Sequence, residues 1–154
     1  MSTKFIDKSK QPPLDLILDE LIRDKNQLLS KSLDAHSLGN GQFHILNEVN
    51  WKEGISQEEI ARIRKIDKSA VARSVKRLIE NGYINKERDQ QDGRAFRLYP
   101  TDKGRQMMPQ IKRIVQELDQ TLSQGSTPEE IELFKKICRR MNQNIENAAA
   151  PQCG

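Results

Sequence analysis

The chain has 154 residues, of which 35% are hydrophobic and 31% charged. This length is enough for one compact domain, or for a small domain carried on helices that a partner subunit covers. Its net charge is +4, and the positive excess lies between Ser56 and Arg105, a segment with 13 Lys and Arg and 8 Asp and Glu. Such an excess is typical of a phosphate-binding surface, although a solvated basic face has the same composition. The sequence has neither the roughly 20 consecutive apolar residues that span a bilayer nor the apolar core of a secretory signal, so we expect no membrane partner and a cytoplasmic location.

The first predicted helix follows a polar arm. Residues Met1–Pro13 show no hydrophobic period and end in two prolines, which predicts a flexible arm before a helix start. From Leu14 to Ser32 apolar residues recur every three or four positions, the spacing of a helix with one apolar face. Gly39–Asn40–Gly41 breaks this pattern, and a short second helix follows, ending between Asn50 and Gly54. Its apolar residues are Phe43, Leu46 and Val49.

Two further short helices are predicted next. Ser56–Gln57–Glu58–Glu59 is a capping box, in which the first and last side chains each satisfy a backbone amide at the helix start. The residues that we expect this third helix to bury are Ile60 and Ile63. Asp67 is a suitable N-cap for a fourth helix running to about Asn81, where Gly82 supplies the left-handed residue that ends it. Its predicted apolar stripe consists of Val71, Val75, Leu78 and Ile79.

A hairpin and two amphipathic helices complete the predicted elements. The strand-like segments Tyr83–Arg88 and Ala95–Tyr99 flank a turn-rich, charged segment. A helix begins after Thr101 and continues to about Gln124, with a bend at Pro109. The capping box Thr127–Glu130 opens the final helix, and we expect a frayed tail over Ala148–Gly154. The apolar stripe of this final helix consists of Ile131, Phe134, Ile137, Met141 and Ile145.

Short helices followed by a charged hairpin are typical of a winged helix-turn-helix, whose second helix of the turn lies in the major groove of DNA. The predicted fold class is therefore mainly α with a small β-hairpin. Packing of the apolar sides of the third and fourth helices would leave four residues projecting from the free face, namely Ser69, Ala70, Arg73 and Arg77.

Arg73 is the first candidate for reading a base, because a guanidinium can bond both O6 and N7 of guanine. Lys68 and Lys76 are better suited to holding phosphates as point charges. The alternative is that these residues are the ordinary charges of an exposed helix. At the hairpin tip, Arg94 follows Asp92 at a spacing that would let the carboxylate orient the guanidinium toward the minor groove.

With these features the chain resembles the MarR family of bacterial and archaeal regulators. The matching segments are Ser56–Ala61, Asp67–Ile84, Arg88–Asp89, Asp92–Arg94 and Thr101–Gly104. The resemblance implies a homodimer whose first and last helices interlock and whose two winged domains bind a pseudo-palindromic operator. It divides the chain into an arm and first dimerisation helix (1–38), a winged helix-turn-helix DNA-binding domain (39–100), and C-terminal dimerisation helices with a tail (101–154).

The resemblance also implies roles for single residues. It places Arg73 and its neighbours in the major groove and Arg94 in the minor groove, with Asp92 holding Arg94 in place. The expected DNA-binding residues are Lys68, Ser69, Ala70, Arg73, Ser74, Lys76, Arg77, Arg88, Asp92 and Arg94. Members of this family often lose DNA affinity when a small effector such as an aromatic acid binds, so a repressor released by a small molecule is expected. The chain departs from the family at Gly93, where a second arginine is common, and at Tyr99–Pro100.

The sequence offers little for catalysis. Its only histidines, His36 and His44, have no recognisable chemical partner, and its cysteines, Cys138 and Cys153, lack the spacing of metal ligands. We therefore expect no enzyme, no cofactor and no metal site. The competing functions are a winged module that coats DNA without sequence preference and one that contacts protein.

Overall fold

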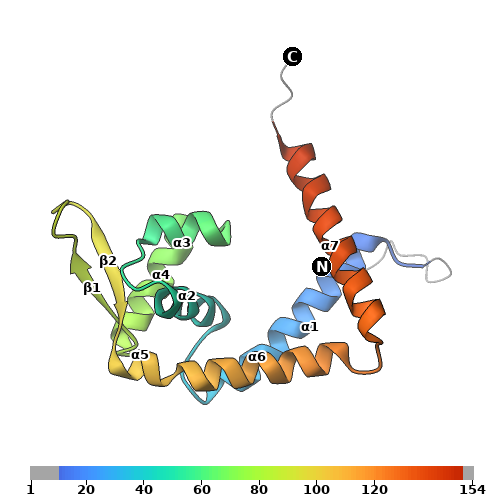
Figure 1. Cartoon of the computed structure of the whole chain (residues 1–154), viewed down its shortest axis with the longest axis horizontal. Helices are drawn as coiled ribbons and strands as arrows, with labels where there is room; N and C mark the ends of the chain where they lie inside the picture. Colours follow the sequence, from blue (N-terminus) through green and yellow to red (C-terminus); the bar gives the residue numbers. More distant parts are fainter. Residues whose placement is uncertain (1–10, 151–154) are drawn as a thin grey trace, which may run out of the picture. The chain divides into compact units, whose positions relative to one another are not determined.

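The structure is a computed structural model that describes residues 11–150. The elements in chain order are α1 (Leu14–Asp34), α2 (Asn40–Trp51), α3 (Gln57–Arg64), α4 (Lys68–Glu80), β1 (Ile84–Arg88), β2 (Phe96–Pro100), α5 (Asp102–Gln106), α6 (Met108–Ser123) and α7 (Pro128–Ala149) (Figure 1). The predicted mainly helical fold with one hairpin is confirmed. Most of the predicted arm, as well as Cys153, lies outside the described residues.

The chain divides into two compact units, the first ending at Val115 and the second beginning at Gln116. The core of the first unit lies where α2 and α3 pack against α4 and where the hairpin covers α2 and α3 (Figure 1). Fully buried side chains in this core include Leu46, Val49, Ile60, Val71, Val75, Leu78 and Leu98. Each such side chain contributes about 1.5–3 kcal/mol through removal of its apolar surface from water. This packing fixes the third and fourth helices relative to each other.

The hairpin pairs β1 with β2 in an antiparallel register that aligns Ile84 with Pro100 and Arg88 with Phe96. Its second strand is also joined to the loop between α2 and α3. The amide of Leu98 donates to the carbonyl of Ile55 at 3.1 Å, and the amide of Gly54 donates to the carbonyl of Leu98 at 2.8 Å. Because a two-stranded hairpin alone is marginally stable in water, this extra pairing anchors the base of the wing.

The starts of α3, α5 and α7 and the end of α4 follow the predicted capping chemistry. The Ser56 hydroxyl accepts from the amide of Glu59 at 3.1 Å, and the Glu59 carboxylate accepts from the amide of Ser56 at 2.9 Å. Gly82 has a φ of +74°, in the region that favours glycine, and follows the last turn of α4. Thr101 caps α5 by accepting from the amide of Gly104 at 3.1 Å. The expected capping box at Thr127 is also present at the start of α7.

The second helix starts earlier than the glycine break predicted. It begins at Asn40, so Gly41 lies inside its first turn rather than before it. The side-chain amide of Asn40 donates to the carbonyl of Asn26 in α1 at 3.0 Å, which holds this end of the helix. A Cβ at Gly41 would meet the Ser74 hydroxyl of α4 at 3.3 Å, so a small residue fits the approach of α2 to α4.

Two isoleucines that were expected in the apolar stripes are exposed. Ile63 is 51% exposed and Ile79 is 38% exposed. The buried side of α3 lies between Ile60 and Ala61, and successive helical residues are about 100° apart, so Ile63 points away from it. Ile79 lies at the edge of the stripe of α4 for the same reason. The expectation that Ile63 helps to pack α3 on α4 was therefore wrong.

The helix after Thr101 is broken rather than bent. It ends at Gln106, and α6 begins at Met108 with Pro109 in its first turn. Proline has no amide hydrogen and its ring clashes with the carbonyl four residues earlier, so the helix cannot continue through Pro109. The buried residues around this break and in the first half of α6 are Met107, Ile111 and Ile114.

Large apolar side chains remain exposed in both units. In α1 and the first half of α6 they are Leu14, Ile17, Leu21, Ile22, Leu28 and Val115. In the second unit, which holds the rest of α6 and α7, they are Leu122, Leu133, Phe134 and Ile145. No described residue of α7 is buried, and α7 remains helical to Ala149, further than the expected fraying. No helix among residues 11–150 is both long enough and apolar enough to cross a membrane.

Candidate nucleic-acid interface

The face of α4 opposite its buried valines presents the predicted reading residues. Val71, Val75 and Leu78 are buried in the core. The expected DNA-binding residues of α4 that are exposed are Lys68, Ser69, Arg73, Lys76 and Arg77, whereas Ala70 and Ser74 are half-buried. The only ion pair that joins two residues of α4 is between Lys76 and Glu80, at 3.9 Å on the surface, and such an exposed pair holds its lysine weakly.

The start of α4 differs from the predicted cap. Asp67 occupies the N-cap position, but its carboxylate makes no capping bond and instead accepts a hydrogen bond from the Ser69 hydroxyl. This bond, more than any other contact, lowers the pKa of Asp67. The Ser69 hydroxyl is therefore already engaged as a donor at the end of the helix that would enter a groove.

The turn of the hairpin is ordered by its own aspartates. The Asp89 carboxylate accepts from the amides of Gln91 at 2.8 Å and Asp92 at 3.4 Å. The amide of Ala95 donates to the carbonyl of Asp92 at 2.9 Å, and the amide of Asp89 donates to the carbonyl of Ala95 at 2.9 Å. Side-chain bonds of this kind stabilise a turn locally. The wing tip therefore has one hydrogen-bonded shape even though its residues are exposed.

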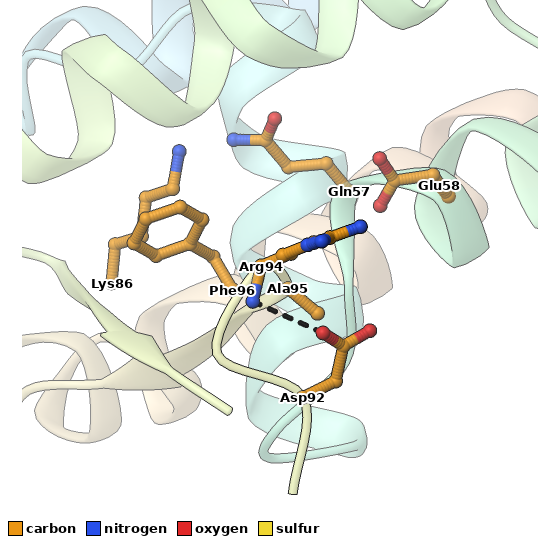
Figure 2. A pocket seen from close by; sticks show the side chains of 7 residues that line it. All are labelled: Gln57, Glu58, Lys86, Asp92, Arg94, Ala95 and Phe96. Atoms are coloured by element: carbon orange, nitrogen blue, oxygen red, sulfur yellow. Dashed lines mark hydrogen bonds between the residues drawn. The ribbon is translucent and has the colours of Figure 1, made fainter. Parts of the chain in front are cut away.

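Asp92 and Arg94 lie together, but not through the contact that was expected. The Asp92 carboxylate accepts from the backbone amide of Arg94 at 3.0 Å, the bond drawn as a dashed line in Figure 2. The guanidinium of Arg94 points away from that carboxylate, toward the side where Gln57 and Glu58 lie (Figure 2). The expectation that Asp92 holds the guanidinium was wrong, because at a separation of two residues the carboxylate meets the nearer amide.

An open pocket of about 260 Å³ lies between the wing and the start of α3 (Figure 2). Its lining residues are Gln57, Glu58, Lys86, Asp92, Arg94, Ala95 and Phe96. Lys86 lies 4.6 Å from the centre of the Phe96 ring and Arg88 lies 5.7 Å from it, so the ring gathers two cations along the wing. The Arg88 guanidinium also donates to the carbonyl of Gly93 at 3.4 Å.

Sequence reasoning missed Lys86 and Phe96 as part of this surface. A signal was present, because Lys86 and Arg88 alternate along β1 and therefore share one face. The register that sets Phe96 opposite Arg88 could not be known without the length of the turn. The wing thus carries Lys86 in addition to the two arginines expected from the sequence, Arg88 and Arg94.

Both histidines interact with other residues of the first unit. The carbonyl of His36 accepts from the Tyr83 hydroxyl at 2.7 Å. Burial and the nearby Arg64 and Lys25, in that order, lower the pKa of the half-buried His44. Among residues 11–150, no group of three or more His, Cys, Asp or Glu side chains is arranged to hold a metal ion.

Comparison with known proteins agrees with this geometry. The profile of the MarR family matches residues 36–95. The HTH-type transcriptional regulator BilQ of Clostridioides difficile (strain CD3) is 30% identical over 125 residues, which are 80% of this chain and 84% of that protein. An uncharacterized HTH-type transcriptional regulator of Bacillus subtilis (strain 168), YybA, is 29% identical over 137 residues, covering 84% and 91%.

A solved structure supports the same assignment. The MarR family transcriptional regulator from Listeria monocytogenes, crystallised with a 26mer DNA, superposes with a TM-score of 0.80 at 26% identity. The superposition covers 90% of this chain and 92% of that one. The exposed arginine face of α4, the ordered wing and these similarities lead to one conclusion: the chain belongs to the MarR family of transcriptional regulators.

Proposed function

We propose that this chain is a cytoplasmic, sequence-specific regulator that binds double-stranded DNA as a homodimer and represses transcription until a small-molecule effector releases it. The observation that carries the proposal is the two-sided character of α4. Its valine and leucine side is buried in the core, while Arg73 and its basic neighbours are exposed in the same compact unit as the wing.

In this proposal α4 enters the major groove. Arg73 reads a base, because its guanidinium is exposed and can bond both acceptors of guanine. Lys68, Lys76 and Arg77 hold phosphates on either side of the groove, which positions the helix without reading sequence. Ala70 and Ser74 are half-buried at the base of this face, so they permit close approach rather than make long contacts.

The wing supplies the second set of contacts. Arg94 at the tip would enter the adjacent minor groove, whose negative potential attracts a guanidinium. Arg88 and Lys86, gathered around Phe96, would lie along the phosphates beside it. Asp92 serves this surface indirectly, because it accepts from the amide of Arg94 and so shapes the turn.

The proposal of a homodimer is supported by the apolar side chains left exposed on α1, α6 and α7. Isolated exposed leucines are ordinary, but helices that each expose several large apolar side chains are typical of a subunit interface. The segments 1–38 and 101–154 would then form the dimer, and 39–100 would bind DNA. Two copies related by a two-fold axis would require an operator with half-sites about one helical turn apart.

Repression and its release by a small molecule are proposed from family membership. A ligand that binds the free dimer better than the DNA-bound dimer shifts the population away from DNA by its differential affinity. A change in the spacing between the two α4 helices of the dimer would suffice to release DNA, because both helices must contact the same duplex.

Selection of bound sequences from random duplexes tests the function directly. The purified chain is incubated with a random 30-base-pair pool, and bound molecules are sequenced over several rounds. The expected result is a two-fold motif bound by two chains, as counted by native mass measurement. A preference without symmetry would instead indicate a DNA-coating protein, and absence of binding at moderate salt would indicate a protein-contact module.

A further inference from the structure

One arginine joins the wing to the helix-turn-helix. The Nε of Arg97 in β2 donates to the Asp89 carboxylate at 2.7 Å. Its Nη1 donates to the Glu59 carboxylate of α3 at 3.4 Å and to the carbonyl of Gly54 at 3.3 Å. The planar guanidinium thus contacts three separate parts of the first unit at once, with its donors held in a fixed, planar arrangement that the compact ammonium of a lysine lacks.

On the wing side, the partner of Arg97 is the residue that shapes the turn. One oxygen of the Asp89 carboxylate accepts from the amides of Gln91 and Asp92, and the other accepts from Arg97. The amide of Gln91 first, and then Arg97, lower the pKa of Asp89, so this carboxylate is charged at neutral pH. Its side chain is only 15% exposed. A shift of Arg97 therefore moves the start of the turn that carries Arg94.

On the helix side, the partner of Arg97 is the capping residue of α3. Glu59 accepts from the amide of Ser56 and also pairs with Lys52 at 2.8 Å. Because the capping box fixes Glu59 to the backbone of α3, Arg97 is attached to a rigid group rather than to a free side chain. The wing is therefore tied to the helix that packs directly on α4.

We propose that Arg97 is a positioning residue for DNA binding, which sets the wing tip relative to the reading helix so that Arg94 and Arg73 meet one duplex together. This inference rests on the proposed function. The cluster of Lys52, Arg97, Glu59 and Asp89 holds two positive and two negative charges and is close to neutral. Arg97 therefore adds little attraction for phosphates, and its effect on DNA binding passes through Arg94.

A double-mutant cycle tests this coupling. The affinities of the wild type, Arg97→Gln, Arg94→Ala and the double variant for the selected operator duplex are measured over a range of salt concentrations. We expect Arg97→Gln to weaken binding about three- to tenfold when Arg94 is present and less than twofold when it is absent. The slope of log K against log salt should stay unchanged for Arg97→Gln and should flatten by about 2 for Arg94→Ala, one phosphate-like contact for each subunit.

A matched control is a second arginine that links separate parts of the first unit through a carboxylate. Arg105 of α5 pairs with Glu53, which follows α2, at 2.9 Å. Arg105→Gln should change affinity less than twofold in both backgrounds. If Arg97→Gln and Arg94→Ala instead give multiplicative losses, or if Arg97→Gln flattens the salt slope, Arg97 acts independently or contacts phosphate and the inference is overturned.

A second variant guards against a folding defect. Asp89→Asn keeps an oxygen for the amide of Gln91 but removes the charge that binds Arg97, so it should reproduce the non-additive loss with Arg94→Ala. None of these substitutions removes an atom of the backbone pairing between Leu98 and Ile55, and thermal unfolding checks that each variant is folded. If the wild type binds no duplex, the proposed function fails. If it binds a two-fold motif and both cycles are additive, the inference alone fails.

Discussion

The carboxylate of Asp92 accepts a hydrogen bond from the backbone amide of Arg94 at 3.0 Å, while the guanidinium of Arg94 points elsewhere. Asp92 therefore supports the shape of the wing turn and leaves the charge of Arg94 free. This relationship differs from a carboxylate–guanidinium pair in a way that two substitutions distinguish, because asparagine keeps the acceptor oxygen and loses the charge.

For Asp92→Asn we expect operator affinity equal to or above that of the wild type, since the acceptor remains and a negative charge near DNA is removed. Asp92→Ala should weaken binding about two- to tenfold, because the turn loses a hydrogen bond. Fluorescence anisotropy with a labelled operator measures both. An equal loss in the two variants would show that the charge of Asp92, and hence a pair with the guanidinium, is what matters.

Substitutions on α4 distinguish residues that recognise a base from residues that bind phosphates. Arg73→Ala should cost about 1–3 kcal/mol on the operator and relax the preference at one base, because a bidentate contact to guanine is lost. Lys76→Ala should weaken operator and random duplexes alike and flatten the salt dependence. Competition titrations with both duplexes measure these effects, with Arg105→Ala as the charge control. Equal losses of Arg73→Ala on operator and random DNA would exclude Arg73 from base reading.

Much of the fold could be predicted from local chemistry. The capping boxes at Ser56 and Thr127 and the stop at Gly82 depend only on neighbouring residues, so the starts of α3 and α7 and the end of α4 were predicted within a residue or two. The exposure of Ile63 could not be predicted, because an eight-residue helix shows its apolar residues without indicating which side meets α4. Gly41 was predicted to break the helix, whereas its role is to allow the close approach of α2 to Ser74 of α4, a tertiary contact that the local sequence does not reveal.

The candidate site was predicted less completely. The exposed arginines of α4 follow from its period, since three buried residues define the opposite face. The contacts of the wing depend on the register and on residues distant in sequence. Arg97 was overlooked because its partners, Asp89 and Glu59, lie in the turn and in α3, and Glu59 was understood only as a capping residue.

The exposed apolar side of α7 gives a test of the homodimer. Phe134 is 50% exposed in the single chain, so Phe134→Asp should leave an isolated subunit folded but weaken a dimer that covers this ring, by about 1.5–3 kcal/mol for each subunit. Lys136→Asp is the control, since it lies two residues on and about 200° around the helix. Sedimentation at several concentrations measures the effect. Dimers of unchanged stability in Phe134→Asp would place the interface elsewhere.

The pH dependence of stability provides a test of Glu59. Its hydrogen bond with Lys52, then that with the amide of Ser56, lower the pKa of Glu59 from 4.5 to about 2. Because the folded state holds this carboxylate in its charged form, its stabilising contribution is fully present above pH 4.5 and is lost as the pH falls toward 2. Glu59→Gln keeps the capping box but cannot titrate, so its deficit in the free energy of unfolding should be largest at neutral pH and should shrink through this window. Urea unfolding at a series of pH values measures the difference. A deficit that stays constant from neutral pH to pH 2 would mean that the charge of Glu59 does not stabilise the fold, and that Arg97 and Lys52 bind it only as a neutral acceptor would be bound.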